Sequence, residues 1–515
     1  GFYYKTFMWP KSFWENVYEP FIRKAAGLGK LAIGEPDPDS YEKCWAHCDL
    51  LVSGGGPTGL SAALAAARAG LRVIVCDEGA SLGGSLLSTS LSVGGNSAAA
   101  HAAFMIAELK SFDTVTLLAR STVFGWFDDM VFGAVERVQK HMASPVPERP
   151  VERIWRIAAR RAILASGAEE RPLVFGGNDR PGIMTASAMR TYANRYGVAA
   201  GKRVAVFANG ASGYETARDL SAKGVEIAAV IDTRASADDV LPDGIRRIAG
   251  GGIVDTRGHL RLSGITVERA GFQEVIGCDA LAMSGGWSPI IHLLCQRGAK
   301  PEWSDEQAAF LAPVTDPAFQ PAGSAAGIHG LGDCMADGWA KASAVIADLG
   351  GTPSAYEMPW VEGEAATGFS PVWYVPGAKS KAFVDFQNDV HVSDLGLALR
   401  EGYGHVEHAK RYTTNGMATD QGKLGNVNAS AIIASMQGLS PRDVGTTTFR
   451  PFYTPVTFGA LAGASRFEHA TPVRLSPLHG WAKKNGAVMV EAGLWYRSSW
   501  FPKAGESGWR QSVDR

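Results

Sequence analysis

Short apolar runs alternate with alanine-rich or amphipathic stretches along the first two thirds of the chain, a pattern typical of strands that alternate with helices. The apolar runs predict strands at 48–53, 71–76, 115–124, 161–167, 204–208, 225–231 and 280–286. Helical patterns predict helices at about 58–70, from 213 to about Lys223, and at about 340–349. This order predicts an α/β fold that contains two strand–helix–strand units.

The first predicted strand runs directly into a glycine-rich turn, Gly54-x-Gly56-x-x-Gly59. In such a turn Gly54 makes the tight bend, Gly56 lets a pyrophosphate approach the backbone, and Gly59 lets the helix pack closely on the strand. Phosphates would lie at the helix N-terminus, where unpaired N–H groups and the helix dipole favour negative charge. Strand, glycines and helix in this order favour a dinucleotide site over a glycine-rich turn without a ligand.

An acid follows the second predicted strand at the spacing that such a site requires. Asp77 lies 23 residues after Gly54. Its carboxylate can accept hydrogen bonds from the adenosine ribose hydroxyls, and it disfavours a 2′-phosphate. Gly83-Gly84-Ser85 comes next, and residues from Thr122 to Phe124 are candidates for a wall beside the adenine.

The second strand–helix–strand unit, at 203–232, departs from the glycine pattern. It reads Ala208-x-Gly210-x-x-Gly213 and ends in Asp232, so an alanine stands in place of the first glycine. Alanine is tolerated there if its φ stays negative. A working second nucleotide site and an empty structural unit therefore both remain open.

Beyond 280–286 the chain reaches Gly332-Asp333 ahead of the helix predicted at 340–349. This resembles the motif by which flavoproteins with two dinucleotide-binding domains return an acid to their first dinucleotide. Asp333 is therefore expected beside the cofactor, with a helix N-cap as the alternative role, and both can hold together. The order of units implies one nucleotide domain inserted within another over roughly 47–350.

Composition and charge exclude several classes of function. Lys and Arg number 50 against 51 Asp and Glu, so neither a nucleic-acid partner nor an anionic membrane surface is indicated. No apolar run reaches about 18 residues, and the opening lacks the pattern of an export signal, so we expect no membrane span. The chain starts at Gly1 and stops soon after a new patterned segment begins, which leads us to expect a longer polypeptide.

The six cysteines include no C-x-x-C, which argues against a redox disulfide and favours a reducing cytoplasm. Cys44 and Cys48 are four residues apart and would share a face if they lay on a helix, but a pair alone is not a zinc site. His405 and His408 also lack a nearby third ligand. We therefore predict no metal site.

From Lys381 onward, residues 383–390 and 407–423 resemble the small iron–sulfur module related to bacterioferritin-associated ferredoxin that occurs in some heteromeric amino-acid dehydrogenases. The cluster ligands of that module fall on Asp385, Gln387, Asp420 and Gly425. Because such clusters require thiolate ligands, we predict a helical module without an iron–sulfur cluster. Residues 472–479 and 488–502 resemble the opening of the folate-binding aminomethyltransferase fold.

These elements, in this order and over essentially the whole chain, resemble the α subunits of heterotetrameric sarcosine oxidases. The aromatic opening 1–10, the glycine turn, Arg411–Thr414, Asp420–Lys423 and the folate-domain start carry the resemblance. It implies an NAD site at Gly54, Gly56, Pro57, Thr58, Gly59, Asp77, Glu78, Gly79, Ser85, Phe124 and Asp333.

The resemblance also implies partners and further cofactors. FAD would lie in a β subunit, and FMN would lie between β and this chain, with 411–423 as the candidate wall. Subunits γ and δ would complete the assembly, and tetrahydrofolate would bind beyond residue 515. With O2 and tetrahydrofolate, such an enzyme converts sarcosine to glycine, H2O2 and 5,10-methylenetetrahydrofolate.

No residue is identified as a catalytic base or nucleophile, so we expect amine oxidation to take place on a partner subunit. Three alternatives stay open. One is a subunit of a heteromeric dehydrogenase for proline, hydroxyproline or an opine, although the missing cluster ligands oppose it. The others are a self-sufficient NAD(P)H-dependent FAD reductase and a non-catalytic scaffold stabilised by its nucleotide.

The expected fold is α/β, with two nested Rossmann-like domains resembling glutathione reductase, a cluster-free ferredoxin-like helical module and the beginning of an aminomethyltransferase-like domain. The expected boundaries are 1–46 for a connecting segment, 47–190 with 268–350 for the first dinucleotide-binding domain, 191–267 for the inserted second domain, 351–440 for the helical module, and 441–515 for the linker and the folate-domain start.

Overall fold

The computed structural model describes residues 9–27, 29, 34–35, 37–236, 239–313, 316–364, 368–466, 469–470 and 472–515. Contacts divide the chain into two units, Gly1–Ser40 and Tyr41–Arg515. The first unit contains η1 (Lys11–Phe13), η2 (Trp14–Tyr18) and α2 (Glu19–Ala25). Most of the aromatic opening, residues 1–8, lies outside the described residues.

The first sheet of the second unit has the strand order β5-β2-β1-β8-β7-β6, and β21 pairs with the end of β8. Its strands are β1 (Tyr41–Ser53), β2 (Val73–Cys76), β5 (Val115–Leu118), β6 (Ser121–Trp126), β7 (Val131–Glu136), β8 (Glu152–Leu164) and β21 (Phe319–Pro321). β1 and β8 run parallel over their full length, from Tyr41 opposite Glu152 to Ser53 opposite Leu164. β1 thus begins six residues before the predicted boundary at 47, and Cys44 and Cys48 lie on this strand and not on a helix.

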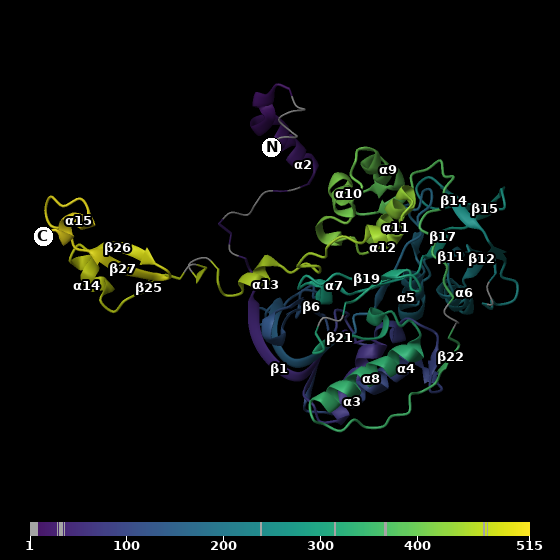
Figure 1. Ribbon diagram of the computed structural model, residues 1–515, viewed down its shortest axis with the longest axis horizontal. Helices are drawn as coiled ribbons and strands as arrows, with labels where there is room; N and C mark the ends of the chain where they lie inside the picture. The colour runs from purple at the N-terminus through teal and green to yellow at the C-terminus, as the bar shows by residue number, and fades with distance from the viewer. Residues whose placement is uncertain are drawn as a thin grey trace. The chain divides into compact units, whose positions relative to one another are not determined.

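Helices α3 (Pro57–Arg68), α4 (Ala98–Lys110) and α8 (Leu331–Asp348) cover one face of this sheet (Figure 1). The alanines of α3 bring it close to α8, and a Cβ on Gly338 would lie only 2.2 Å from the carbonyl oxygen of Thr58. α8 begins nine residues before the predicted start at 340. The glycines of its first turns weaken the helical pattern in the sequence but allow this close packing.

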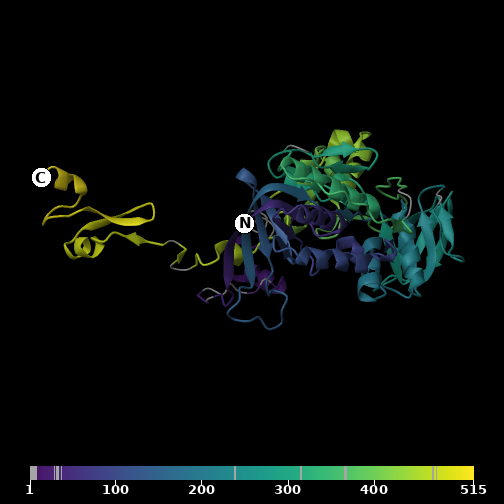
Figure 2. The ribbon, with the colours of Figure 1, turned by 90° about the horizontal axis from the view of Figure 1, so that it is seen from below.

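The second sheet has the order β10-β17-β11-β12-β13 and forms the inserted domain (Figure 2). Its elements are β10 (Ile183–Thr185), α5 (Ala186–Tyr196), β11 (Arg203–Ala208), α6 (Ser212–Ala222), β12 (Glu226–Asp232), β13 (Arg247–Ala249) and β17 (Ala280–Ser284). A third sheet, which is antiparallel, packs on this parallel sheet and consists of β14 (Gly252–Arg257), β15 (Gly264–Arg269) and β16 (Phe272–Gly277).

The inserted domain is larger than predicted. The strand that enters it, β10, pairs directly with the strand that leaves it, β17, so that Ile183 lies opposite Leu281. Because both strands belong to the second sheet, the domain extends beyond the expected limits of 191–267 on both sides. The nested arrangement of two dinucleotide-binding-type domains is confirmed.

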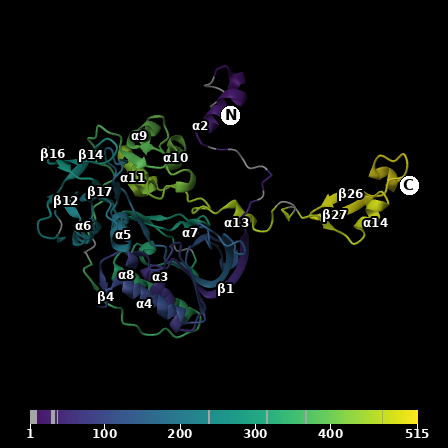
Figure 3. The same ribbon diagram turned by 180° about the vertical axis from the view of Figure 1, so that it is seen from behind.

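The helical module follows a largely irregular segment, here called the strap, whose described residues are 351–364 and 368–382 and which contains β22 (Val361–Glu362). It consists of β23 (Phe383–Asp385), β24 (Val390–His391), α9 (Val392–Arg400), α10 (Val406–Thr413), α11 (Asn426–Gln437) and α12 (Pro441–Val444), gathered around one core (Figure 3).

Two further groups of elements complete the described chain. The first group consists of short strands, helices and 3-10 turns within residues 84–462, namely β3 (Ser92–Val93), β4 (Asn96–Ser97), β9 (Ala168–Glu170), β18 (Trp287–Pro289), α7 (His292–Cys295), β19 (Glu302–Ser304), β20 (Ala309–Leu311), α13 (Phe458–Ala462), η3 (Gly84–Leu87), η4 (Asp128–Met130), η5 (Gly323–Ala326) and η6 (Ala418–Asp420). The C-terminal segment contains β25 (Arg474–Leu475), α14 (His479–Lys484), β26 (Val488–Ala492), β27 (Trp495–Trp500) and α15 (Trp509–Val513). Among all described residues, no helix combines the length and apolarity needed to cross a bilayer.

Candidate functional site

A cavity of about 900 Å³ opens where β1 and β8 end and the inserted domain begins. The glycine turn, the end of β2, η3 and the start of α8 line one part of it. The inserted domain, Lys423 of the helical module, β6 and several connecting loops line other parts. Ligands of open α/β sheets bind at the carboxyl ends of the strands. The cavity therefore lies at the edge of the sheet where a dinucleotide would bind.

The three glycines of the turn face different surroundings. A Cβ on Gly54, whose φ is +111°, would lie 2.1 Å from the carbonyl oxygen of Ala165, and one on Gly59 would lie 1.8 Å from that of Gly54. At both positions the absence of a side chain allows two backbone segments of the protein to pack closely against each other. A Cβ on Gly56, in contrast, would meet nothing nearer than the Cα of Gly84 at 3.9 Å, and Gly56 lines the cavity. The open side of this turn is the cradle that a pyrophosphate requires.

Asp77 combines a structural task with free binding capacity. Its Oδ2 accepts a hydrogen bond from the N–H of Gly55 at 2.7 Å, and its Oδ1 accepts one from the N–H of Gly79 at 2.8 Å. A carboxylate offers about four lone-pair positions, so each oxygen can accept a further bond. Because Asp77 lines the cavity, the remaining positions are available to ribose hydroxyls.

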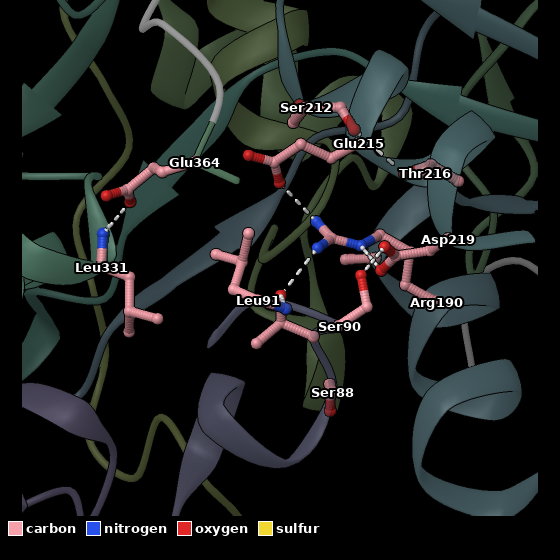
Figure 4. A network of polar contacts seen from close by, with 12 residues as sticks. Ser88, Ser90, Leu91, Arg190, Ser212, Glu215, Thr216, Asp219, Leu331 and Glu364 are labelled. Atoms are coloured by element: carbon pink, nitrogen blue, oxygen red, sulfur yellow. Dashed lines mark hydrogen bonds and ion pairs between the residues drawn. The ribbon is translucent and has the colours of Figure 1, made fainter. Parts of the chain in front are cut away.

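The N-terminus of α8 forms another part of the wall. Gly330 is the N-cap, and Asp333 lies in the first helical turn, so the alternative prediction of an N-cap role for Asp333 is wrong. An acid in this turn stabilises the helix through its dipole. Glu364 adds a second carboxylate, which accepts a hydrogen bond from the N–H of Leu331 (Figure 4).

The structure brings the predicted binding residues together around the cavity, with two exceptions. Gly54, Gly56, Pro57, Thr58, Asp77, Glu78, Gly79, Ser85 and Asp333 line it. Gly59 lies beneath the turn. The ring of Phe124 is buried edge-on against Phe452, with centroids 5.1 Å apart, because an aromatic ring gains more from core packing than from lining a polar cavity. Thr122 and Val123 line the cavity in its place.

At the end of the cavity that borders the helical module, only Lys423 was predicted, as part of the candidate FMN wall at 411–423. There His292 stacks on Tyr453 at a centroid distance of 4.2 Å, and the Lys423 ammonium lies 4.4 Å from the centre of the same ring. Burial, reinforced by the charge of Lys423, lowers the pKa of His292 to about 3, so this imidazole is neutral. Burial also raises the pKa of Glu169. This end therefore offers aromatic surface beside one fixed positive charge.

These residues come from segments that are distant in sequence, and no local pattern identifies them. Glu169 follows β8, His292 begins α7, and Lys423 and Tyr453 belong to the helical module and the chain that follows it. Of the predicted FMN wall at 411–423, Lys423 lines the cavity.

A largely buried ion-pair network joins the first domain to the inserted one (Figure 4). Arg190 on α5 donates to Asp219 at 3.0 Å, to Glu215 at 2.8 Å and to Thr89 at 3.2 Å. Ser90 donates to Asp219 as well. The guanidinium is thus held by two carboxylates of α6 and by the loop after η3, which fixes one wall of the cavity.

Two of the four cluster-ligand positions of the helical module, Asp385 and Gly425, serve other purposes here. Asp385 is buried and accepts hydrogen bonds from the N–H groups of Gln387, Asn388 and Gly416, at 2.7 to 2.9 Å. A Cβ on Gly425 would lie 2.5 Å from the carbonyl oxygen of Val384, so no thiolate fits there without a backbone shift. Hydrogen bonds to a carboxylate hold this loop together.

Comparison with known families divides the chain in the same way as its fold. Residues 48–342 match the pyridine nucleotide-disulphide oxidoreductase family, and residues 379–465 match the sarcosine oxidase A3 domain. L-proline dehydrogenase from P. horikoshii has a similar fold, with a TM-score of 0.62 at 18% identity over 84% of this chain and 82% of its own.

Curated relatives extend the similarity to the whole sequence. The sarcosine oxidase α subunit of Rhizobium meliloti (strain 1021) is 58% identical over 100% of this chain and 52% of its own length. The α subunit of the sarcosine oxidase from Corynebacterium sp. (strain P-1) is 39% identical over 93% of this chain and 52% of its own. One subunit of the opine oxidase of Rhizobium meliloti is 26% identical over 80% of this chain and 87% of its own.

The chain spans about half the length of the sarcosine oxidase relatives. The resemblance to their α subunits that the sequence predicted is confirmed over the full chain. This chain belongs to the pyridine nucleotide-disulphide oxidoreductase family and is similar over its whole length to the α subunits of sarcosine oxidases.

Proposed function

We propose that this chain is the NAD-binding part of the α subunit of a heterotetrameric sarcosine oxidase. The observation that carries the proposal is the open side of Gly56 above the cavity, with the Asp77 carboxylate beside it. The 58% identity to the α subunit of a sarcosine oxidase supports the choice of enzyme.

Each part of the cavity has a task in this proposal. The turn at Gly56 holds the pyrophosphate, Asp77 binds the adenosine ribose and disfavours a 2′-phosphate, and Asp333 with the start of α8 borders the other half of the dinucleotide. Bound NAD supplies a nicotinamide ring that can accept a hydride. No residue of this chain is assigned to the oxidation of the amine.

The whole enzyme would contain β, γ and δ subunits, with FAD in β and FMN between β and this chain. Lys423, at the cavity end of 411–423, supports a flavin wall there. The assembly would convert sarcosine, O2 and tetrahydrofolate to glycine, H2O2 and 5,10-methylenetetrahydrofolate, with the folate bound outside this chain. All six thiols are free, which suits a reducing compartment, and we propose the cytoplasm.

Purification of the chain without partners tests this division of tasks. We expect a colourless protein that releases one equivalent of NAD on heat denaturation, measured by enzymatic cycling, and that forms no peroxide from sarcosine. A yellow protein that retains FAD would favour the reductase alternative. Peroxide formation by the chain alone would show that amine oxidation takes place here.

A further inference from the structure

The inserted domain keeps the frame of a nucleotide site. β11 ends at Ala208, α6 begins at Ser212, and Gly210 stands between them. A Cβ on Gly213 would lie 2.4 Å from the Cβ of Ala208, so this glycine serves the same close packing of helix on strand as Gly59. The fully buried alanine is accommodated at the end of the strand. The backbone alone therefore does not exclude a second dinucleotide.

The turn of this second unit already has a partner from its own chain. The N–H of Ala211 donates to the carbonyl oxygen of Gly368 at 3.0 Å, and the N–H of Ser370 donates to that of Asn209 at 2.9 Å. These bonds make Gly210 and Phe369 an antiparallel bridge. The strap thus uses a turn N–H that a phosphate would require.

The same segment also narrows the space beside Gly210, although Gly210, Ala211 and Ser212 still border the cavity. A Cβ on Gly210 would lie 3.0 Å from the carbonyl oxygen of Gly368, whereas the corresponding Cβ on Gly56 would face the open cavity. A Cβ on Gly286 would lie 2.5 Å from the ring of Phe369. Backbone and ring of the strap, which border the cavity together with Gly210, therefore lie against one side of the second turn.

The acid of the second unit, Asp232, is not accessible to ribose hydroxyls. Asp232 has an exposed fraction of 0%, and it accepts hydrogen bonds from the hydroxyl of Tyr214 at 2.5 Å and from Arg234 at 2.9 Å. Arg234 also donates to the carbonyl oxygen of Gly368 at 3.1 Å, which ties the acid and the strap into one network. Asp77, in contrast, lines the cavity.

We propose that the second unit takes no nucleotide and instead holds Gly368–Ser370 of its own chain as an internal ligand. Dinucleotide binding is then confined to the first unit, and that part of the statement rests on the proposed function. A soluble nicotinamide nucleotide cannot deliver a hydride through the inserted domain. A closed second unit therefore excludes the alternative function of a self-sufficient reductase, which would bind FAD in the first unit and NAD(P)H in the second.

Hydrogen–deuterium exchange of the full chain with NAD, NADH and NADPH tests the proposal. We expect peptides that cover 209–213 to be protected without ligand and unchanged at saturation, while peptides that cover 54–59 gain protection with NAD. Ligand-induced protection at 209–213, or two dinucleotides bound per chain, would overturn it. If neither turn responds, the NAD site of the proposed function fails, and the closed second unit stands.

A matched pair of variants tests the strap directly. Ser370→Pro removes the N–H that bonds to Asn209, whereas Ser370→Ala keeps it. Loss of one hydrogen bond should speed exchange at 209–213 about two- to tenfold in Ser370→Pro, with Ser370→Ala like the wild type. Retained NAD protection at 54–59 shows that the variant is folded. Unchanged exchange at 209–213 in a folded Ser370→Pro variant would show that the strap does not hold the turn.

Discussion

The carboxylate of Asp77 and the backbone N–H of Gly55 form a hydrogen bond of 2.7 Å across the glycine turn. The acid therefore fixes the turn from the neighbouring strand before any ligand binds. Its other oxygen holds Gly79 at 2.8 Å. A single residue in this way fixes the turn for the pyrophosphate and keeps acceptor positions for the ribose.

Asp77→Asn should weaken NAD binding by about 10- to 100-fold, because hydrogen bonds to a charged group contribute about 1.5–3 kcal/mol. Loss of the negative charge should weaken NADP binding less than NAD binding, so the ratio of the NAD affinity to the NADP affinity should fall. Isothermal titration with both nucleotides measures the two affinities. The exposed Asp113 is the control, since Asp113→Asn should change neither. Equal losses for NAD and NADP would contradict a role of the acid in selecting between them.

Two glycines of the same turn should respond differently to alanine. Gly59→Ala places a Cβ 1.8 Å from the carbonyl oxygen of Gly54 and should lower the free energy of unfolding by at least about 1–3 kcal/mol. Gly56 has a φ of −77° that alanine adopts, so Gly56→Ala should keep stability within about 0.5 kcal/mol. Its methyl group should nevertheless reduce NAD affinity at least about tenfold, by about 1.4 kcal/mol.

Denaturant unfolding and NAD titration of both variants separate the two effects. A Gly56→Ala variant that binds NAD as well as the wild type would show that the ligand does not approach this turn. Stability equal to the wild type in Gly59→Ala would contradict the close contact between α3 and the turn.

The ion-pair network around Arg190 should contribute strongly to stability. Arg190→Met removes the guanidinium that pairs with the carboxylates of Asp219 and Glu215. Because those carboxylates then lack their cationic partner, the free energy of unfolding should fall by about 3–5 kcal/mol. The exposed pair of Arg246 and Glu274 serves as the control, because Arg246→Met should cost at most about 1 kcal/mol. Urea unfolding compares the variants, and equal costs would show that the network is no stronger than a surface ion pair.

Local spacing made the first unit predictable. Gly54, Gly56, Gly59 and Asp77 lie within one strand–helix–strand unit, where backbone sterics dictate residue type at fixed intervals. Three of these four residues also line the cavity. The same local pattern could not decide whether the second unit is open, because its turn is closed by Gly368–Ser370, more than 150 residues further along the chain.

Contacts between distant segments account for most of what the sequence did not predict. The limits of the inserted domain follow from the pairing of β10 with β17, and short strands of this kind leave little periodic pattern. Lys423 entered the candidate FMN wall only through the family resemblance, and no local pattern predicts that its ammonium donates to the carbonyl oxygen of Tyr453 at 3.1 Å. Tertiary packing alone creates that end of the cavity.

The neutral state of His292 should make the protein sensitive to acid. Its folded pKa is lowered from 6.5 to about 3, chiefly by burial. Below pH 6.5 the unfolded chain takes up a proton at this ring that the folded chain does not accept until about pH 3. The free energy of unfolding should therefore fall as the pH drops through this window, by at most about 1.4 kcal/mol per pH unit from this residue.

His292→Phe keeps a planar ring against Tyr453 and removes the titrating group. We expect the variant to show a shallower loss of stability between pH 6.5 and 4 than the wild type, whatever constant offset the larger ring introduces. His259→Phe is the control, because His259 is exposed and should leave the slope unchanged. Urea unfolding at half-unit pH steps gives the slopes. Parallel slopes for the wild type and His292→Phe would show that this imidazole is protonated in the folded chain as readily as in the unfolded one.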